Sequence, residues 1–144
     1  MKIKFILLLI ITILIGFLSS KIVYAFNNKK VEKKYNAYIL QIGPLKESDI
    51  KKEVSGLDYY IAVKKNNLNY IYSGISTKVE NIKKIKDIYK SKSSIKIRKS
   101  YINNKEFITN LEQYDLLIDG LSNKKDILSV NKVILSSYED LILR

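Results

Sequence analysis

The stretch Tyr38-Ile39-Leu40-Gln41-Ile42-Gly43-Pro44-Leu45 constrains the fold of this chain more than any other. Its β-branched and aromatic residues favour a strand, in which Leu40 and Ile42 share one face and Ile39 and Gln41 share the other. Proline has no N–H to donate to a sheet ladder, so the Gly-Pro pair is predicted to end the strand. A glutamine within so apolar a strand indicates a sheet with a core on one face and a wetter environment on the other.

The residues that follow predict a βαββαβ order of elements. Ile50 and Val54 are spaced as on one helical stripe, Asn66-Asn67 is typical of a turn, and Thr77 with Glu80 forms a capping-box pattern. The predicted elements are a helix over 46–55, strands over 58–65 and 68–75, a helix from 77 to about 90 and a strand over 95–101.

This order is typical of an α+β fold: a ferredoxin-like, four-stranded antiparallel sheet with its helices on one face and its other face open. The side chains expected to point toward the helices are those of Leu40, Ile42, Ile61, Val63, Ile71, Ile95 and Ile97. The side chains expected to point outward are those of Ile39, Gln41, Tyr60, Tyr70, Tyr72, Lys96 and Arg98. Tyrosines combine an apolar ring with a polar group, so the outward face is a candidate surface for hydroxylated ligands.

The N-terminal segment, residues 1–26, permits two interpretations. Lys2 and Lys4 precede the apolar run Phe5–Leu18, and Val23-Tyr24-Ala25 fits a signal-peptide cleavage site, which would give a secreted protein cleaved after Ala25. The longer stretch Phe5–Phe26 has the length of a transmembrane helix if Lys21 reaches the interface. We expect an uncleaved single-pass anchor, and both interpretations place the residues after about 27 outside the cytoplasm.

The lysine-rich segment 27–36 has no apolar period and is predicted to be a linker. Residues 103–144 are predicted to form two amphipathic helices. Asn103-Asn104 precedes the first and Ser122 or Asn123 the second, while Gly120 ends the first. Such helices must bury their apolar stripes on the sheet, on each other or on a partner. A tail that covers the open sheet face would block a ligand there.

Charge and composition narrow the classes of function. Residues 27–104 hold 18 basic and 7 acidic residues, whereas residues 105–144 hold 5 basic and 7 acidic ones, so the first part is expected to face anionic polymers or surfaces. The chain has no His and no Cys, which removes the commonest general base, the commonest metal ligand and any disulfide. We therefore expect no enzyme activity, no metal and no cofactor. The aromatic motif of RNA-binding sheets is also absent, so we expect no nucleic-acid partner.

The segment Tyr38–Leu45 resembles the opening strand of a SPOR domain, a bacterial peptidoglycan-binding module. There, two hydrophobic residues flank a glutamine and a glycine follows, as in Leu40-Gln41-Ile42-Gly43. Tyr70-Ile71-Tyr72-Ser73-Gly74-Ile75-Ser76 resembles the third strand of that family and its glycine. The resemblance covers about residues 37–102. It departs from the family at Tyr70, where a basic residue is frequent, at Ser73, and at Ile75-Ser76, which lacks a Pro-Phe pair.

The resemblance implies non-catalytic binding of peptidoglycan glycan strands that have lost their stem peptides, in cell division or sporulation. Carried over by position, Gln41, Tyr70 and Tyr72 would line the glycan site, and the strand register adds Tyr60 and Arg98. The alternative is an envelope protein–protein adaptor of similar fold that no longer binds glycan, in which the C-terminal helices contact another envelope protein.

Overall fold

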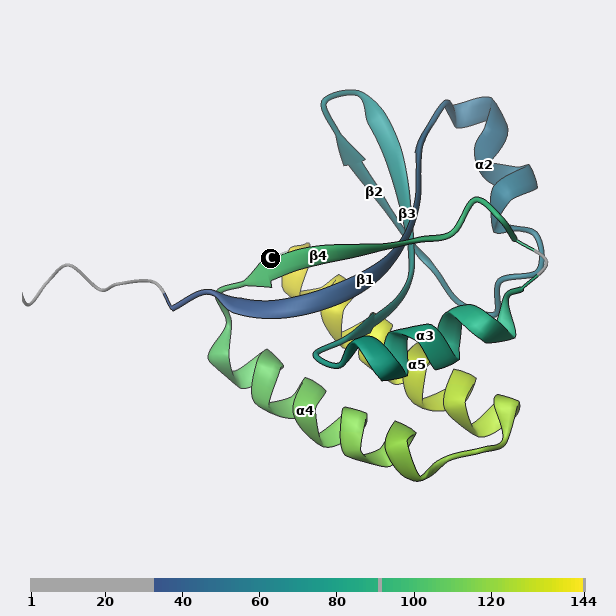
Figure 1. Ribbon diagram of the computed structural model, residues 1–144. Helices are drawn as coiled ribbons and strands as arrows, with labels where there is room; N and C mark the ends of the chain where they lie inside the picture. The colour runs from purple at the N-terminus through teal and green to yellow at the C-terminus, as the bar shows by residue number, and fades with distance from the viewer. Residues whose placement is uncertain (1–32, 91, 144) are drawn as a thin grey trace, which may run out of the picture. The chain divides into compact units, whose positions relative to one another are not determined.

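The computed structural model describes residues 33–90 and 92–143, which belong to one compact unit. Over these residues the fold is α+β, with a four-stranded antiparallel sheet and four helices (Figure 1). In chain order the elements are β1 (Tyr35–Leu45), α2 (Glu47–Val54), β2 (Ile61–Lys65), β3 (Leu68–Ser76), α3 (Val79–Ile88), β4 (Lys96–Ile102), α4 (Lys105–Gly120) and α5 (Lys124–Ile142). The predicted βαββαβ order is therefore observed, and so are the two C-terminal helices.

The strands lie in the order β2-β3-β1-β4, so β1 and β3 are central and every neighbouring pair is antiparallel. β1 begins at Tyr35, so the end of the predicted linker belongs to the sheet. β1 also continues past Gly43-Pro44 to Leu45, where its register with β3 shifts. A register irregularity is the place where a strand tolerates a proline, because no ladder hydrogen bond is required there. Within the described residues no helix is long and apolar enough to cross a bilayer; the predicted anchor or signal peptide, residues 1–26, lies outside them.

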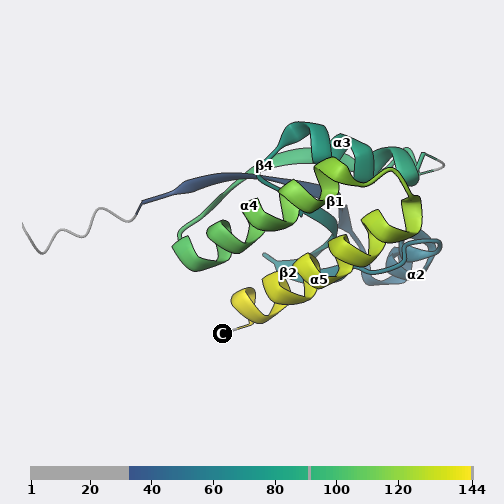
Figure 2. The same cartoon turned by 90° about the horizontal axis from the view of Figure 1, so that it is seen from below.

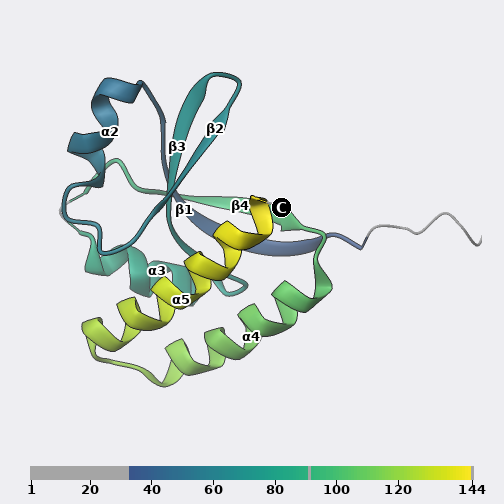
Figure 3. The same cartoon turned by 180° about the vertical axis from the view of Figure 1, so that it is seen from behind.

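Helices lie on both faces of the sheet: α3 packs on one, and α5, which belongs to the C-terminal extension, covers part of the face that was predicted to be open. On one face, Ile85 of α3 and Leu40 of β1 pack around Gly74 of β3. On the other face, the ring of Tyr72 lies 6.4 Å from that of Tyr138 on α5, centroid to centroid. Figures 1 and 3, seen from opposite sides, show α3 and α5 on opposite sides of the central strands, and Figure 2 shows α4 running beside α5.

A β-bulge in β3 provides a polar contact for α5. Leu40 pairs with Gly74 and Gln41 pairs with Tyr72, so Ser73 is the extra residue and has no partner on β1. Its carbonyl accepts a hydrogen bond of 2.9 Å from Nδ2 of Asn131 on α5. Both residues are fully buried, and a buried carbonyl needs a partner. The bulge therefore supplies a polar group that α5 satisfies.

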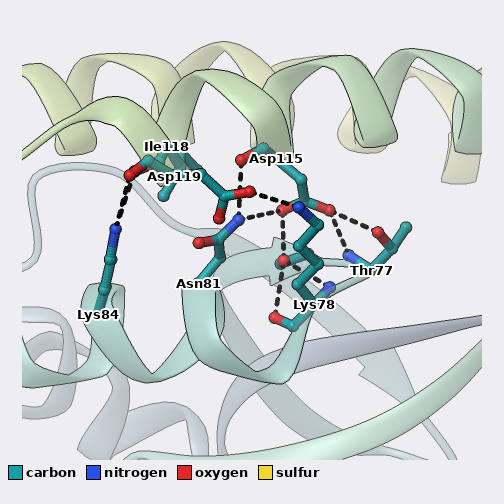
Figure 4. A network of polar contacts seen from close by, with 8 residues as sticks. Thr77, Lys78, Asn81, Lys84, Asp115, Ile118 and Asp119 are labelled. Atoms are coloured by element: carbon teal, nitrogen blue, oxygen red, sulfur yellow. Dashed lines mark hydrogen bonds and ion pairs between the residues drawn. The ribbon is translucent and has the colours of Figure 1, made fainter.

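A buried polar cluster, shown in Figure 4, attaches α4 to the junction of β3 and α3. Asp115 of α4 accepts hydrogen bonds from the Ser76 hydroxyl, from the Thr77 N–H and hydroxyl, and from the Asn81 amide. The hydroxyl of Thr77 is therefore not the N-cap of α3 that the capping-box pattern predicts. α3 begins at Val79, and the preceding Lys78 makes no side-chain cap. Tertiary hydrogen bonds to a buried carboxylate outweigh a local cap, because an unpaired buried charge is very costly.

The predicted caps of the two C-terminal helices are confirmed. Asn104 accepts a hydrogen bond from the Phe107 N–H at the start of α4, and Asn123 accepts one from the Lys125 N–H at the start of α5. The apolar stripes of the two helices join the core of the sheet through Phe107, Leu111, Ile118, Ile127, Ile134, Leu135 and Tyr138. The helices are therefore an integral part of the domain.

Candidate functional site

The sheet face that carries Gln41 is covered by α5 at one end and is more open at the other. On this face Gln41 of β1 pairs with Tyr72 of β3 and with Lys96 of β4, while Ile39 pairs with Arg98. Directly paired residues of antiparallel strands point to the same side. The predicted grouping of Gln41, Tyr72, Lys96 and Arg98 on one face is therefore observed. We call the part of this face formed by Gln41, Tyr70, Lys96 and Arg98 the open strip; its two cations are exposed, and Gln41 and Tyr70 are half-buried.

Gly43 creates the space that the Tyr70 ring occupies. A Cβ atom on Gly43 would lie 3.3 Å from Cδ1 of Tyr70 and 2.8 Å from the carbonyl oxygen of Asn69. Gly43 also has a φ of +118°, a backbone conformation that other residues rarely adopt. The ring of Tyr70 therefore lies against the bare backbone of β1, two residues from Gln41, and is held there by the strand itself.

Tyr72 does not belong to the open strip, which corrects the prediction that it lines the ligand face. Only 5% of its surface is exposed, because Tyr138 of α5 covers its ring. Tyr138 in turn packs on Phe107, with ring centroids 5.5 Å apart. Ile39, also predicted to point outward, is buried as well. The two C-terminal helices have made this end of the face part of the core.

Tyr60 is also not placed with the other predicted site residues. Ile61 is the partner of Tyr72, and Val63 is the partner of Tyr70, so Ile61 and Val63 share the face of the open strip. Alternation then turns Tyr60 to the other side. The predicted faces of the strand over 58–65 are thus inverted. Tyr60 precedes β2 and is exposed, but the strand pairing separates it from Gln41 and Tyr70.

The same register adds Lys65, which the sequence reasoning missed. Lys65 alternates with Val63 on this face, and its Nζ lies 5.9 Å from the centroid of the Tyr72 ring. A signal for this was present in the sequence, because Asn66-Asn67 is typical of a turn. In the structure both residues have positive φ and form a two-residue turn. A two-residue hairpin fixes the register of its strands, so the pairs Lys65–Leu68, Val63–Tyr70 and Ile61–Tyr72 follow from the turn alone.

The open strip is positively charged. The exposed side chains of Lys96 and Arg98 make no ion pair within the described part of the chain, and neither does Lys65. An amide, a half-buried aromatic ring and unpaired cations can bind a ligand that has hydroxyl groups, an apolar face and negative charge. Within residues 33–90 and 92–143, no group of three or more acidic side chains is placed to hold a metal ion.

A hollow of about 540 Å³ lies away from the open strip, between the end of α3 and the α4–α5 loop. Charges of both signs line it, among them Lys84, Asp87 and Asp119, and Lys84 donates to the carbonyls of Ile118 and Asp119 at the end of α4. This lysine stabilises the C-terminus of α4, and the mixed charges of the lining indicate no particular ligand.

The chain matches no protein-family model, no curated protein and no solved structure.

Proposed function

We propose that residues 33–143 form a non-catalytic, ferredoxin-like module of the SPOR type that binds peptidoglycan glycan strands through the open strip. The observation that carries the proposal is the position of the Tyr70 ring against Gly43, beside Gln41 and within the face that also carries Lys96 and Arg98. The glutamine and glycine are the residues on which the SPOR resemblance depends, and both lie on the strand that carries the open strip.

Each residue of the open strip has a chemical role in this proposal. The Tyr70 ring packs on the apolar face of a sugar ring, and its hydroxyl bonds to a sugar oxygen. Gln41 supplies both a donor and an acceptor for hydroxyl and acetamido groups. Lys96 and Arg98 attract the carboxylates that remain on a glycan strand when its stem peptides have been removed. Tyr72 and Tyr60 have no part in it.

The N-terminal segment completes the proposal. We infer a cell-membrane protein anchored by one helix within residues 1–26, with the residues after about 27 outside the cytoplasm, or a secreted one if cleavage follows Ala25. Such a protein would place its binding module beside the cell wall, where glycan strands are processed during division or sporulation.

The test is a pull-down of the full chain in mild detergent on purified sacculi, with and without amidase treatment. We expect retention that increases after the amidase has removed stem peptides. Gln41→Ala and Tyr70→Ala should each reduce retention several-fold, with melting temperatures close to that of the parent protein. Lys83→Gln, an exposed charge change on α3, is the matched control and should bind normally. Normal retention of both strip variants would contradict the proposal.

A second candidate, an envelope protein–protein adaptor that has lost glycan binding, is favoured by two observations. α5 covers Tyr72, which removes part of the face that a SPOR ligand would use. In addition, α4 exposes Leu116 and Leu117. Equal failure to bind treated and untreated sacculi would leave this function in place of the first.

A further inference from the structure

We propose that the end of the β1–β4 ribbon binds an anionic lipid surface. This ribbon tip, defined by Lys33, Lys34, Lys99 and Tyr101, shares no residue with the open strip. The inference goes beyond glycan binding, but it rests on the membrane attachment that is part of the proposed function.

The antiparallel pairing brings the tip together. Asn36 pairs with Tyr101 and Tyr38 pairs with Lys99, so the residues that open β1 lie beside the residues that close β4. Figure 1 shows the start of β1 and the end of β4 side by side, next to the start of α4. Lys33 and Lys34, which immediately precede β1, are exposed. Three lysines thus lie along the last few residues of the ribbon, at the end where the chain enters the domain.

The exposure of Tyr101 is the second observation. It is 61% exposed, although it lies within a strand, and the Nζ of Lys99 lies 5.7 Å from its ring centroid. A tyrosine beside lysines is the combination found where proteins meet the headgroup region of a bilayer, because the ring prefers the interface and the cations attract anionic lipids. None of Lys33, Lys34 and Lys99 makes an ion pair in the part of the chain that the structure covers, so their charge is available.

The position of the tip selects lipid over glycan as its ligand. Lys99 and Tyr101 alternate with Arg98 along β4, so they point to the face opposite to the open strip. In the sequence, only a short polar segment containing Lys29 and Lys30 separates Lys33 from the apolar N-terminal segment. If that segment is in the bilayer, the ribbon tip is the first folded surface that reaches the headgroups.

The experiment uses the full chain in nanodiscs that contain neutral lipids alone or a mixture with anionic phosphatidylglycerol. The chain has no Cys, so a fluorophore on Asn36→Cys reports the tip uniquely, and one on Ser122→Cys reports the exposed α4–α5 loop at the far end of α4. A lipid-borne quencher measures how close each label lies to the headgroups. We expect quenching at position 36 that increases with the anionic fraction, and little at position 122.

Two triple variants have the same net charge and separate a specific tip from general basicity. Removal of Lys33, Lys34 and Lys99 by substitution with Gln should lower the ratio of bound to unbound tip by about fivefold for each lysine. Substitution of Lys51, Lys52 and Lys83, which are exposed elsewhere, should leave it unchanged. Tyr101→Ser should weaken the quenching with the charge intact.

Equal quenching in neutral and anionic nanodiscs would overturn the inference, and so would an equal effect of both triple variants. Loss of sacculus binding in Tyr101→Ser would assign this surface to the polymer and would also overturn it. Gln41→Ala and Tyr70→Ala alter only the glycan surface, so the inference and the proposed function fail in separate measurements.

Discussion

Thr77 and Asp115 are joined by two hydrogen bonds to the same carboxylate oxygen. The Thr77 backbone nitrogen lies 2.8 Å and its Oγ1 lies 2.6 Å from Oδ2 of Asp115. Asp115 is completely buried, and its other oxygen accepts from Ser76 and from Nδ2 of Asn81, the latter at 3.1 Å. One carboxylate thus accepts the backbone N–H at the junction of β3 and α3, and it holds α4 against that junction.

Asp115→Ala should be strongly destabilising, because it leaves several buried donors without an acceptor. We expect a loss of about 3 kcal/mol in the free energy of unfolding and a melting temperature lower by about 10 °C, measured by urea and thermal unfolding. Lys78→Gln removes the exposed ion pair with Asp119 and should change stability little. Equal, small effects of the two variants would show that the cluster does not hold α4.

Tyr72→Ala and Tyr72→Phe should separate a core residue from a ligand residue. The alanine variant leaves a cavity under Tyr138 and should cost about 3 kcal/mol of stability. The phenylalanine variant keeps the ring contact and should stay close to the parent in both stability and sacculus binding. A Tyr72→Ala protein that is fully stable but does not bind sacculi would return this residue to the ligand surface.

Gly43→Ala should damage both the strand and the open strip. The positive φ and the nearby Asn69 carbonyl make any side chain at this position strained, and we expect a loss of about 1–3 kcal/mol with weaker sacculus binding because Tyr70 is displaced. Gly120→Ala is the control: a Cβ there meets nothing within 4 Å, so its stability should be equal or slightly higher. Similar behaviour of the two variants would argue against the close approach at Gly43.

The stability of the domain should fall in alkaline solution. Burial raises the pKa of Tyr138 above its ordinary value, and burial also raises the pKa of Tyr89. The folded state therefore holds these two phenolic protons more tightly than the unfolded state does. Their contribution to the free energy of unfolding is complete below the unfolded-state pKa of about 10, and it is lost as the pH rises through the folded-state pKa. Urea unfolding should give a lower free energy of unfolding at about pH 11 than at about pH 9, and this difference should be smaller in Tyr138→Phe. An undiminished decrease in Tyr138→Phe would mean that other groups cause it.

Salt should weaken sacculus binding through Lys96 and Arg98. Both side chains are exposed, so their attraction to glycan carboxylates is screened as ionic strength increases. The double variant Lys96→Gln, Arg98→Gln should bind more weakly than the parent at about 0.05 M salt, and the two should converge toward about 1 M. The double variant Lys83→Gln, Lys86→Gln on α3 is the charge-matched control. A difference that persists at high salt would indicate a role other than charge.

The element order could be predicted from the sequence because it depends on local signals. Alternation over Tyr38–Ile42, the Asn66-Asn67 turn and the caps at Asn104 and Asn123 all act within a few residues. The grouping of Gln41 with Lys96 and Arg98 was also predictable, since alternation along antiparallel neighbours is a local property. The faces of β2 were predictable in principle, because the two-residue turn sets the register.

Only the tertiary structure decided which part of the predicted face is open. The bulge at Ser73 and the Asn131 amide that satisfies it are 58 residues apart, as Asp115 is 38 residues from Thr77, and no local pattern connects either pair. The stripes of α4 and α5 show that these helices must be buried, but an amphipathic stripe does not specify its partner. Apolar packing of α5 on this face, together with the Asn131–Ser73 hydrogen bond, covers Tyr72. A predicted ligand residue is therefore part of the core, while Gln41 and Tyr70 stay at the surface.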